Sequence, residues 1–113
     1  MDDEKKLQEL IKKATPLTEA SYYILISLKE PLHGYGVMQK VDELSQKRVQ
    51  LGPGTLYGAL SNLQTLGLIE AVGESASERR KLYCMTESGR MIAEHEVIRF
   101  EELARHGRML LGM

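Results

Sequence analysis

The sequence predicts a mainly α-helical fold with a small β-hairpin, followed by a long C-terminal helix. Three observations carry this prediction. Apolar residues recur at helical spacing over most of the chain, two strand-like segments follow each other closely, and a long amphipathic segment comes after them. The predicted order is helix, helix, helix, short strand, helix, strand, strand and long helix. Two helices joined by a tight connection, with a hairpin after the second, form a winged helix-turn-helix.

Prolines separate the helices predicted for the first half of the chain. The first helix covers residues 4–14, where apolar residues fall at i, i+3, i+4 and i+7, and Pro16 ends it. Thr18 is placed to cap a second helix that reaches about Lys29. Its predicted buried residues are Ala20, Tyr23, Ile24, Ser27 and Leu28. A third helix is expected over 34–45, with an apolar face made of Val37, Met38, Val41 and Leu44.

The second half of the chain predicts a short strand, a helix, a hairpin and the long last helix. The run 49–51 alternates apolar and polar residues, which indicates a small strand. Pro53 suits the first turn of a helix over 53–66, because the N–H that proline lacks has no helical partner there. Gly67 ends that helix. The remaining predicted elements are strands over 69–74 and 78–85 and a helix over 87–110 that Thr86 caps.

Length and composition indicate how many domains the chain forms and in which cellular compartment it is expected. The chain has 113 residues, a formal net charge of −1 and 27% charged residues, which suits one globular unit. Nucleic-acid binding stays open, because it needs a local basic patch rather than a basic total. A single cysteine, Cys84, fits a reducing compartment. We expect a cytoplasmic protein with no membrane partner, because the sequence has neither a signal peptide pattern nor an apolar run of membrane-spanning length.

The helix over 53–66 carries the residues expected to meet DNA bases. In a helix-turn-helix, the second helix enters the major groove and presents its N-terminal half to base edges. Small and amide side chains lie opposite the apolar stripe of this helix, and Asn, Ser and Thr can contact bases or phosphates. These residues are Thr55, Gly58, Ser61 and Asn62, with Tyr57 beside the buried stripe of Leu56, Leu60 and Leu63.

Basic residues are expected to contact the phosphates. Between Gly52 and Glu78 the chain has no Lys or Arg, and then three basic residues follow in a row on the predicted hairpin. Phosphate contacts supply most of the affinity for DNA, while base contacts supply discrimination. Arg79, Arg80 and Lys81 on the hairpin are expected to reach phosphates or the minor groove. Further phosphate contacts are expected from Lys40, Lys47 and Arg48 of the preceding helix. The alternative for each is an ordinary solvated side chain.

Three motifs resemble the PadR family of bacterial transcriptional regulators. They are HGYGVMQKV at 33–41, GTLYGALSNLQTLGLIE at 54–70 and RRKLYCMTESG at 79–89. The resemblance covers residues 18–90 and implies a homodimeric winged-helix repressor that binds a pseudo-palindromic operator. It implies DNA-facing roles for Tyr57 and Thr55, and wing roles for Arg80 and Lys81. The length suits the short members of this family, which have a single C-terminal dimerisation helix. The family often has Lys or Arg where this chain has Ser61 and Asn62.

The last helix carries a predicted dimer interface. A 4-3-4-3-4 spacing of apolar and small residues forms a heptad seam, which consists of Ala93, Val97, Phe100, Ala104, Gly107 and Leu111. The alternative is packing on its own domain. Residues 1–86 are thus predicted to form the DNA-binding domain and 87–113 the dimerisation helix. Leu7 and Ile11 of the first helix are expected to pack on the partner's last helix. Some short relatives bind flat hydrophobic compounds between these helices, which suggests a small hydrophobic effector near Met91 and Phe100.

Catalysis and metal binding are not predicted. His95 and His106 lie about 16 Å apart along one helix, too far to share a metal, and His33 lies in a connector. Cys84 has no histidine nearby in sequence, and GPGTLYG lacks the Lys-Ser/Thr ending of a phosphate-binding loop. No cofactor is expected. The alternative function from another class is a winged-helix module that binds protein rather than DNA, which the uncharged helix over 53–66 favours.

Overall fold

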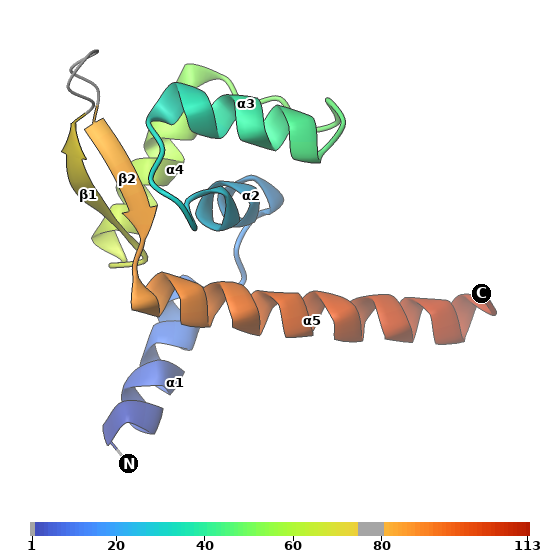
Figure 1. The fold of residues 1–113 in the computed structure, drawn as a ribbon. Helices are drawn as coiled ribbons and strands as arrows, with labels where there is room; N and C mark the ends of the chain where they lie inside the picture. The colour runs from blue at the N-terminus through green and yellow to red at the C-terminus, as the bar shows by residue number, and fades with distance from the viewer. Residues whose placement is uncertain (1, 75–80) are drawn as a thin grey trace.

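The computed structural model describes residues 2–74 and 81–113 and confirms the mainly helical fold with its hairpin (Figure 1). The helix-turn-helix consists of the third and fourth helices, and the hairpin that follows them is the wing. A long helix then crosses beneath the domain. The elements are α1 (Asp2–Ala14), α2 (Glu19–Ser27), α3 (Gly34–Leu44), α4 (Pro53–Thr65), β1 (Ile69–Glu74), β2 (Lys81–Met85) and α5 (Glu87–Leu111).

The wing is an antiparallel pair, and a third segment joins it where none was predicted. The register sets Ile69 opposite Met85 and contains a bulge between Ala71 and Gly73. Leu32, in the connector before α3, exchanges both backbone hydrogen bonds with Tyr83 of β2, at 3.1 and 2.9 Å. This bridge ties the start of α3 to the wing.

The strand predicted over 49–51 is wrong. The hydroxyl of Ser45 accepts a hydrogen bond from the Val49 amide at 3.0 Å, and Gln46 and Lys47 have positive φ values that turn the chain. Leu51 is buried in the core. The alternating pattern therefore reflects a connector anchored by its apolar side chains, and none of the described strands pairs with it.

The core surrounds α2, which packs against α3, α4 and α5. Ile24 and Leu25 of α2 are fully buried, and so is Leu28, which caps its C-terminal end. The prediction missed Leu25 because it assumed that one face of this helix is buried, whereas neighbours cover it from three sides. Leu44 was expected on the buried face of α3 but is 51% exposed, since it lies in the last turn, where the core ends.

The start of α5 is fixed by a cap and by a close backbone contact. The Thr86 hydroxyl accepts from the Gly89 amide at 3.0 Å and donates to the Gly67 carbonyl at 2.7 Å. A Cβ on Gly89 would overlap the carbonyl oxygen of Leu68, so only glycine lets α5 approach β1 this closely. The first half of α5 is buried through Ile92, Ala93 and Glu96.

Glu96 is a fully buried carboxylate that joins α5 to the linker before α2. It accepts a hydrogen bond from the Leu17 amide at 2.7 Å and pairs with Arg99, whose Nε lies 2.6 Å from Oε2. The hydrogen bonds from Arg99 lower the pKa of Glu96, desolvation opposes them, and the Leu17 amide adds to the lowering. The carboxylate thus stays charged inside the fold because two donors satisfy it.

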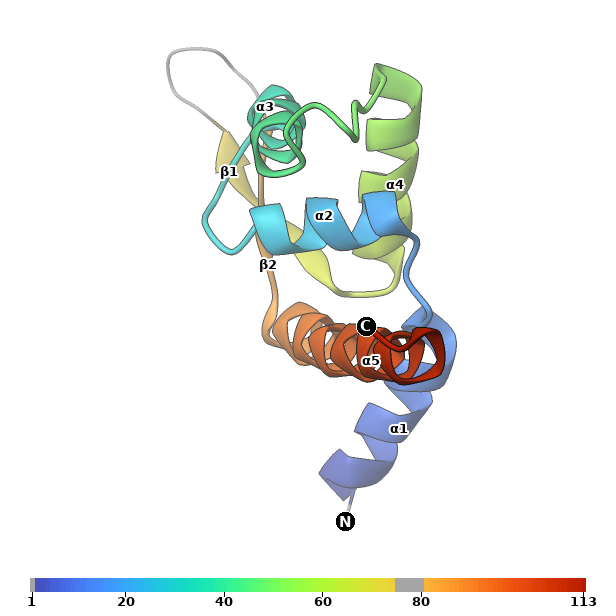
Figure 2. The same ribbon diagram turned by 90° about the vertical axis from the view of Figure 1, so that its right-hand side faces the viewer.

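The second half of α5 extends beyond the domain. Figure 2 looks along this helix from its C-terminal end, with the helix-turn-helix above it and α1 below it. Past Phe100 the side chains of α5 are exposed except for half-buried Gly107, and no other element of the described chain reaches them. Gly112 ends the helix in the left-handed conformation, with φ 70°.

Candidate nucleic-acid interface

The helix α4 presents an uncharged polar face on the outside of the molecule. Leu56, Leu60 and Leu63 are buried, and they hold the helix against the core. All four residues predicted on the opposite face are exposed: Thr55, Gly58, Ser61 and Asn62. Gly52 caps α4 without a side-chain hydrogen bond, and Pro53 occupies its first turn. The first amides of α4 are therefore left for solvent or for a ligand.

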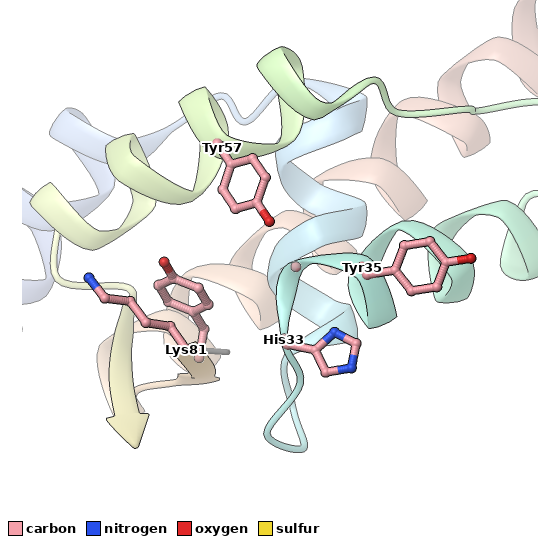
Figure 3. Close-up of a pocket in the computed structure, with 6 residues that line it drawn as sticks. His33, Tyr35, Tyr57 and Lys81 are labelled. Carbon is pink, nitrogen blue, oxygen red and sulfur yellow. The ribbon is translucent and has the colours of Figure 1, made fainter. Parts of the chain in front are cut away.

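A cleft of about 380 Å³ opens beside this face, between the start of α3, α4 and β2. Figure 3 shows Tyr57 reaching from α4 and Lys81 from β2 around one space, with His33 and Tyr35 at the start of α3. Gly34 and Tyr83 complete the lining. Residues more than twenty positions apart in sequence thus meet at one site, and the bridge between Leu32 and Tyr83 holds its two sides together.

The chemistry of the cleft suits an anion. Lys81 contributes an ammonium group, Tyr57 and Tyr83 contribute phenols that can donate hydrogen bonds, and no carboxylate is among the described residues that line it. His33 caps α3, its Nδ1 accepting from the Gly36 amide at 3.0 Å. The positive end of the α3 dipole therefore lies at the cleft, where it favours negative charge.

Sequence reasoning found only part of this cleft. Tyr57 and Lys81 were predicted to contact DNA, but His33 was assigned to a connector, and neither Tyr35 nor Tyr83 was considered. Their signal was the spacing of aromatic and glycine residues in HGYG and KLY. The pattern does not by itself place these residues together, because it is the bridge between Leu32 and Tyr83 that sets α3 beside β2.

The basic residues predicted for phosphate contacts do not share one location. Lys81 is exposed at the start of β2, and Lys40 is exposed on α3, whereas Arg79 and Arg80 lie outside the described residues. Lys47 is exposed just after α3, at the end of that helix farther from the wing (Figure 1).

Arg48, one of the predicted phosphate contacts, forms a surface ion pair within its own chain. Its guanidinium pairs with both carboxylate oxygens of Glu19, at 2.9 and 3.1 Å, and lies 3.4 Å from the Tyr23 hydroxyl. The hydrogen bond from Arg48 lowers the pKa of Glu19, and the same bond raises the pKa of Arg48. Arg48 ties the connector after α3 to the start of α2, so its donors face a carboxylate of its own chain rather than a phosphate.

The predicted seam on α5 is partly covered by the chain's own domain. Ala93, predicted for the dimer interface, is only 6% exposed and belongs to the chain's own core. Phe100 packs edge-on against Tyr22, with ring centroids 4.9 Å apart. Val97 is 40% exposed on the flank. The members that the described chain leaves uncovered are Ala104, Gly107 and Leu111, joined by Leu103 and Leu110.

The two residues proposed to line an effector pocket do not share one in the single chain. Met91 borders a groove of about 600 Å³ with Leu7 and Leu10 between α1 and α5. Phe100 borders a separate hollow of about 290 Å³ with Tyr22 and others. Ile11 is half-buried and packs against the chain's own core. A single effector site that includes both Met91 and Phe100 is therefore not formed within one chain.

Metal-binding clusters and membrane-spanning helices are both absent from the part of the chain that the structure describes. No group of three or more His, Cys, Asp or Glu side chains among them is arranged to hold a metal ion. None of the helices that the structure describes is long and apolar enough to cross a membrane.

The helix-turn-helix, the wing and the anion-suited cleft together define a winged-helix protein. The chain belongs to the transcriptional regulator PadR-like family, whose model matches residues 23–95. This match confirms the resemblance seen in the three motifs, and the family consists of transcriptional regulators rather than enzymes.

Other proteins are similar to this chain in fold or in sequence. A PadR family transcription regulator from Clostridium difficile R20291 is 24% identical with a TM-score of 0.74, over 83% of this chain and 99% of that one. BpsR of Bordetella bronchiseptica, whose DNA binding is regulated by 6-hydroxynicotinic acid, is 18% identical with a TM-score of 0.64, over 92% and 76%. An uncharacterised 37.1 kDa protein in transposon TN4556 of Streptomyces fradiae is 37% identical over 79 residues, and these span 69% of this chain but only 22% of that protein.

Proposed function

We propose that the chain is a homodimeric, sequence-specific DNA-binding repressor. The observation that carries the proposal is the cleft at α3, α4 and β2, which is lined with hydrogen-bond donors and adjoins the uncharged polar face of α4. A DNA phosphate in the cleft would fix the position of α4, and the α4 side chains would then meet base edges. Such a repressor acts where bacterial DNA is, which is the cytoplasm.

Base discrimination is assigned to the exposed face of α4. Asn62 can form a paired hydrogen bond with adenine, and Thr55 and Ser61 can donate to a base or to a phosphate. Apart from its chain neighbours and the backbone of its own helix, Gly58 has no atom within 4 Å of the place where a Cβ would lie, so DNA backbone or bases can approach the helix closely there. Because this face lacks charge, most of the electrostatic affinity must come from the wing and from α3.

Dimerisation is assigned to the uncovered half of α5. The buried positions Gly89, Ile92, Ala93 and Glu96 continue at the same helical spacing as Phe100, Leu103, Ala104, Gly107 and Leu110. This stripe packs on the chain's own core along its first half, and Phe100 still packs against Tyr22. Beyond Phe100 the stripe packs on nothing in the described chain. A second copy would cover it, and the small Ala104 and Gly107 would allow close approach. Two-fold symmetry would set two α4 helices roughly 34 Å apart, one turn of DNA.

Release of the repressor from DNA is assigned to a small hydrophobic effector. Its support is the regulation of BpsR by 6-hydroxynicotinic acid, together with the two hollows that flank α5. In a dimer the uncovered half of the partner's α5 would run past these hollows. The division into a DNA-binding domain over 1–86 and a dimerisation helix over 87–113 is likewise a proposal, and the first half of α5 serves both parts.

The test of DNA binding compares two lysine variants. Lys81→Ala removes a charge at the cleft, and Lys13→Ala removes one from exposed α1 on the far side of the domain (Figure 1). Fluorescence anisotropy with labelled duplex DNA at several salt concentrations gives the slope of log K against log salt. Lys81→Ala should weaken binding to every sequence and reduce the slope by about 1, while Lys13→Ala should leave both unchanged. Identical slopes for Lys81→Ala and the unmodified protein would remove the wing from the interface.

The protein-binding alternative rests on the uncharged face of α4. A module of that kind would bind its partner through mostly neutral groups, and its affinity would change little with salt. DNA binding through several phosphates weakens steeply instead, so the same titration separates the two functions.

A further inference from the structure

Gly34 makes an unusually close contact with Tyr57. A Cβ built on Gly34 would lie 2.8 Å from the Tyr57 hydroxyl oxygen, 3.1 Å from Cζ and 3.2 Å from Cε1. The phenol of Tyr57 therefore lies directly against the backbone of the first turn of α3, across the gap between the two helices of the helix-turn-helix (Figure 3). Gly36, two residues further along the same helix, has no such close neighbour. A Cβ built on Gly36 would come nearest to the Leu32 side chain, at 3.4 Å.

The backbone of α3 does not itself require glycine at this position. Gly34 is not among the described residues with positive φ, so an alanine could adopt its conformation. Alanine is also the better residue in a helix, by about 1 kcal/mol in the interior. The space that the phenol occupies is thus the structural reason for glycine here.

The Tyr57 hydroxyl lies against the protein, while much of the rest of the side chain is exposed to solvent. It is 54% exposed although its hydroxyl meets buried Gly34. The contact brings the hydroxyl to the start of α3, where the helix dipole favours an anion, and into the lining of the cleft that contains Lys81. A phenol in this place can donate a hydrogen bond to a phosphate oxygen.

We infer that Gly34 is a positioning residue, whose missing side chain lets the Tyr57 phenol lie across α3 and donate to a DNA phosphate in the cleft. The inference rests on the proposed DNA-binding function and adds a specific contact and its cause. The three nearest atoms that a Cβ at Gly34 would meet all belong to the rotatable phenol of Tyr57. The phenol would swing away, the fold would stay intact, and the phosphate contact would be lost.

The experiment is a set of four variants measured against labelled duplex DNA by fluorescence anisotropy. Gly34→Ala and Tyr57→Phe should each weaken binding by roughly tenfold, the loss of one hydrogen bond to a charged group. The double variant should be no weaker than either single one, because both changes remove the same contact. Gly36→Ala makes the same chemical change in the same helical turn with room for the methyl group, and it should bind like the unmodified protein.

Salt dependence separates this contact from that of Lys81. Tyr57 is neutral and releases no counterion, so Gly34→Ala should lower the affinity equally at every salt concentration and leave the slope unchanged. Unchanged affinity of Gly34→Ala, with DNA binding by the unmodified protein, would overturn the inference. The inference would also be overturned if Gly34→Ala weakened DNA binding as much in the Tyr57→Phe protein as it does in the unmodified protein. The loss of affinity would then come from a change in the fold rather than from the Tyr57 hydroxyl.

The contact between Gly34 and Tyr57 can also be tested without DNA, by NMR spectroscopy of the free protein. The Gly34 amide and Hα resonances should move between the unmodified protein and Tyr57→Leu, because an aromatic ring against the backbone shifts nearby protons, and the Gly36 resonances should move less. Unmoved Gly34 resonances would show that the ring lies elsewhere and would overturn the inference. Failure of the unmodified protein to bind DNA, with the Gly34 shift present, would reject the proposed function and the phosphate contact while leaving the packing contact established.

Discussion

Replacing Glu96 with Ala tests how α5 is fastened to the rest of the domain. The carboxylate is fully buried and accepts from the Leu17 amide and from Arg99. Its removal leaves a buried amide without an acceptor, at a cost of about 1–3 kcal/mol. Arg99 has 30% of its side chain exposed and can turn to water, so the lost pair adds only about 0.5 kcal/mol. We expect the free energy of unfolding to fall by about 2–3 kcal/mol.

The assay is urea unfolding followed by circular dichroism at a fixed protein concentration. At a slope of roughly 1.5 kcal/mol per M, the midpoint should fall by about 1.3–2 M. Glu94→Ala is the matched control, since Glu94 lies on the same helix with 63% of its side chain exposed and pairs only with Arg90 at the surface. That variant should unfold within about 0.5 kcal/mol of the unmodified protein. Equal midpoints for Glu96→Ala and Glu94→Ala would refute the reasoning.

The pH dependence of the same variant carries a definite sign. The pKa of Glu96 in the folded protein lies below its ordinary value of 4.5, mainly because of Arg99. A lowered carboxyl pKa gives stability that is fully present above the unfolded pKa and is lost as pH falls through the folded pKa. The stability difference between the unmodified protein and Glu96→Ala should therefore be constant near neutral pH and shrink below about 4.5. A difference that grows on acidification would contradict the assigned cause.

Three further substitutions test other contacts. Gly89→Ala should destabilise the fold by about 2 kcal/mol in thermal or urea unfolding, because its Cβ meets the Leu68 backbone; unaltered stability would mean that α5 sits farther from β1. Thr86→Ala should cost about 1 kcal/mol through loss of the α5 cap, and a neutral effect would argue against that cap. Leu103→Glu should give monomers in sedimentation equilibrium, whereas Ile98→Glu, on the opposite side of α5, should stay dimeric; the reverse result would move the interface to the other face.

Much of the fold was predictable because local signals determine it. Helix caps, prolines and apolar spacing mark most boundaries within a residue or two, as for Thr18 and Thr86. The wrong predictions fall where contacts with other elements determine the structure of a segment. The run 49–51 alternates like a strand, but its apolar side chains anchor a connector, and the segment that pairs with β2 is Leu32 instead. The spacing of apolar residues and the strand propensity of a segment describe that segment alone. They do not show which other segment it pairs with.

The candidate site was less predictable for the same reason. Motif resemblance found Tyr57 and Lys81, but the cleft also needs His33 at the start of α3, and only the bridge to β2 brings it there. Arg48 was assigned to DNA from its charge, whereas its carboxylate partner, Glu19, lies 29 positions earlier in the sequence. On α5 the heptad spacing predicted the apolar stripe, but spacing alone could not divide it between the chain's own core and a second copy.

The measurement that tests the central claim most directly is the salt dependence of DNA binding by the unmodified protein. Fluorescence anisotropy would compare the duplex upstream of the protein's own gene with a shuffled duplex of the same composition, at several salt concentrations. We predict that log K falls linearly and steeply with log salt for both, and that the upstream duplex binds more tightly. A folded, dimeric protein that binds neither duplex at low salt would contradict the account.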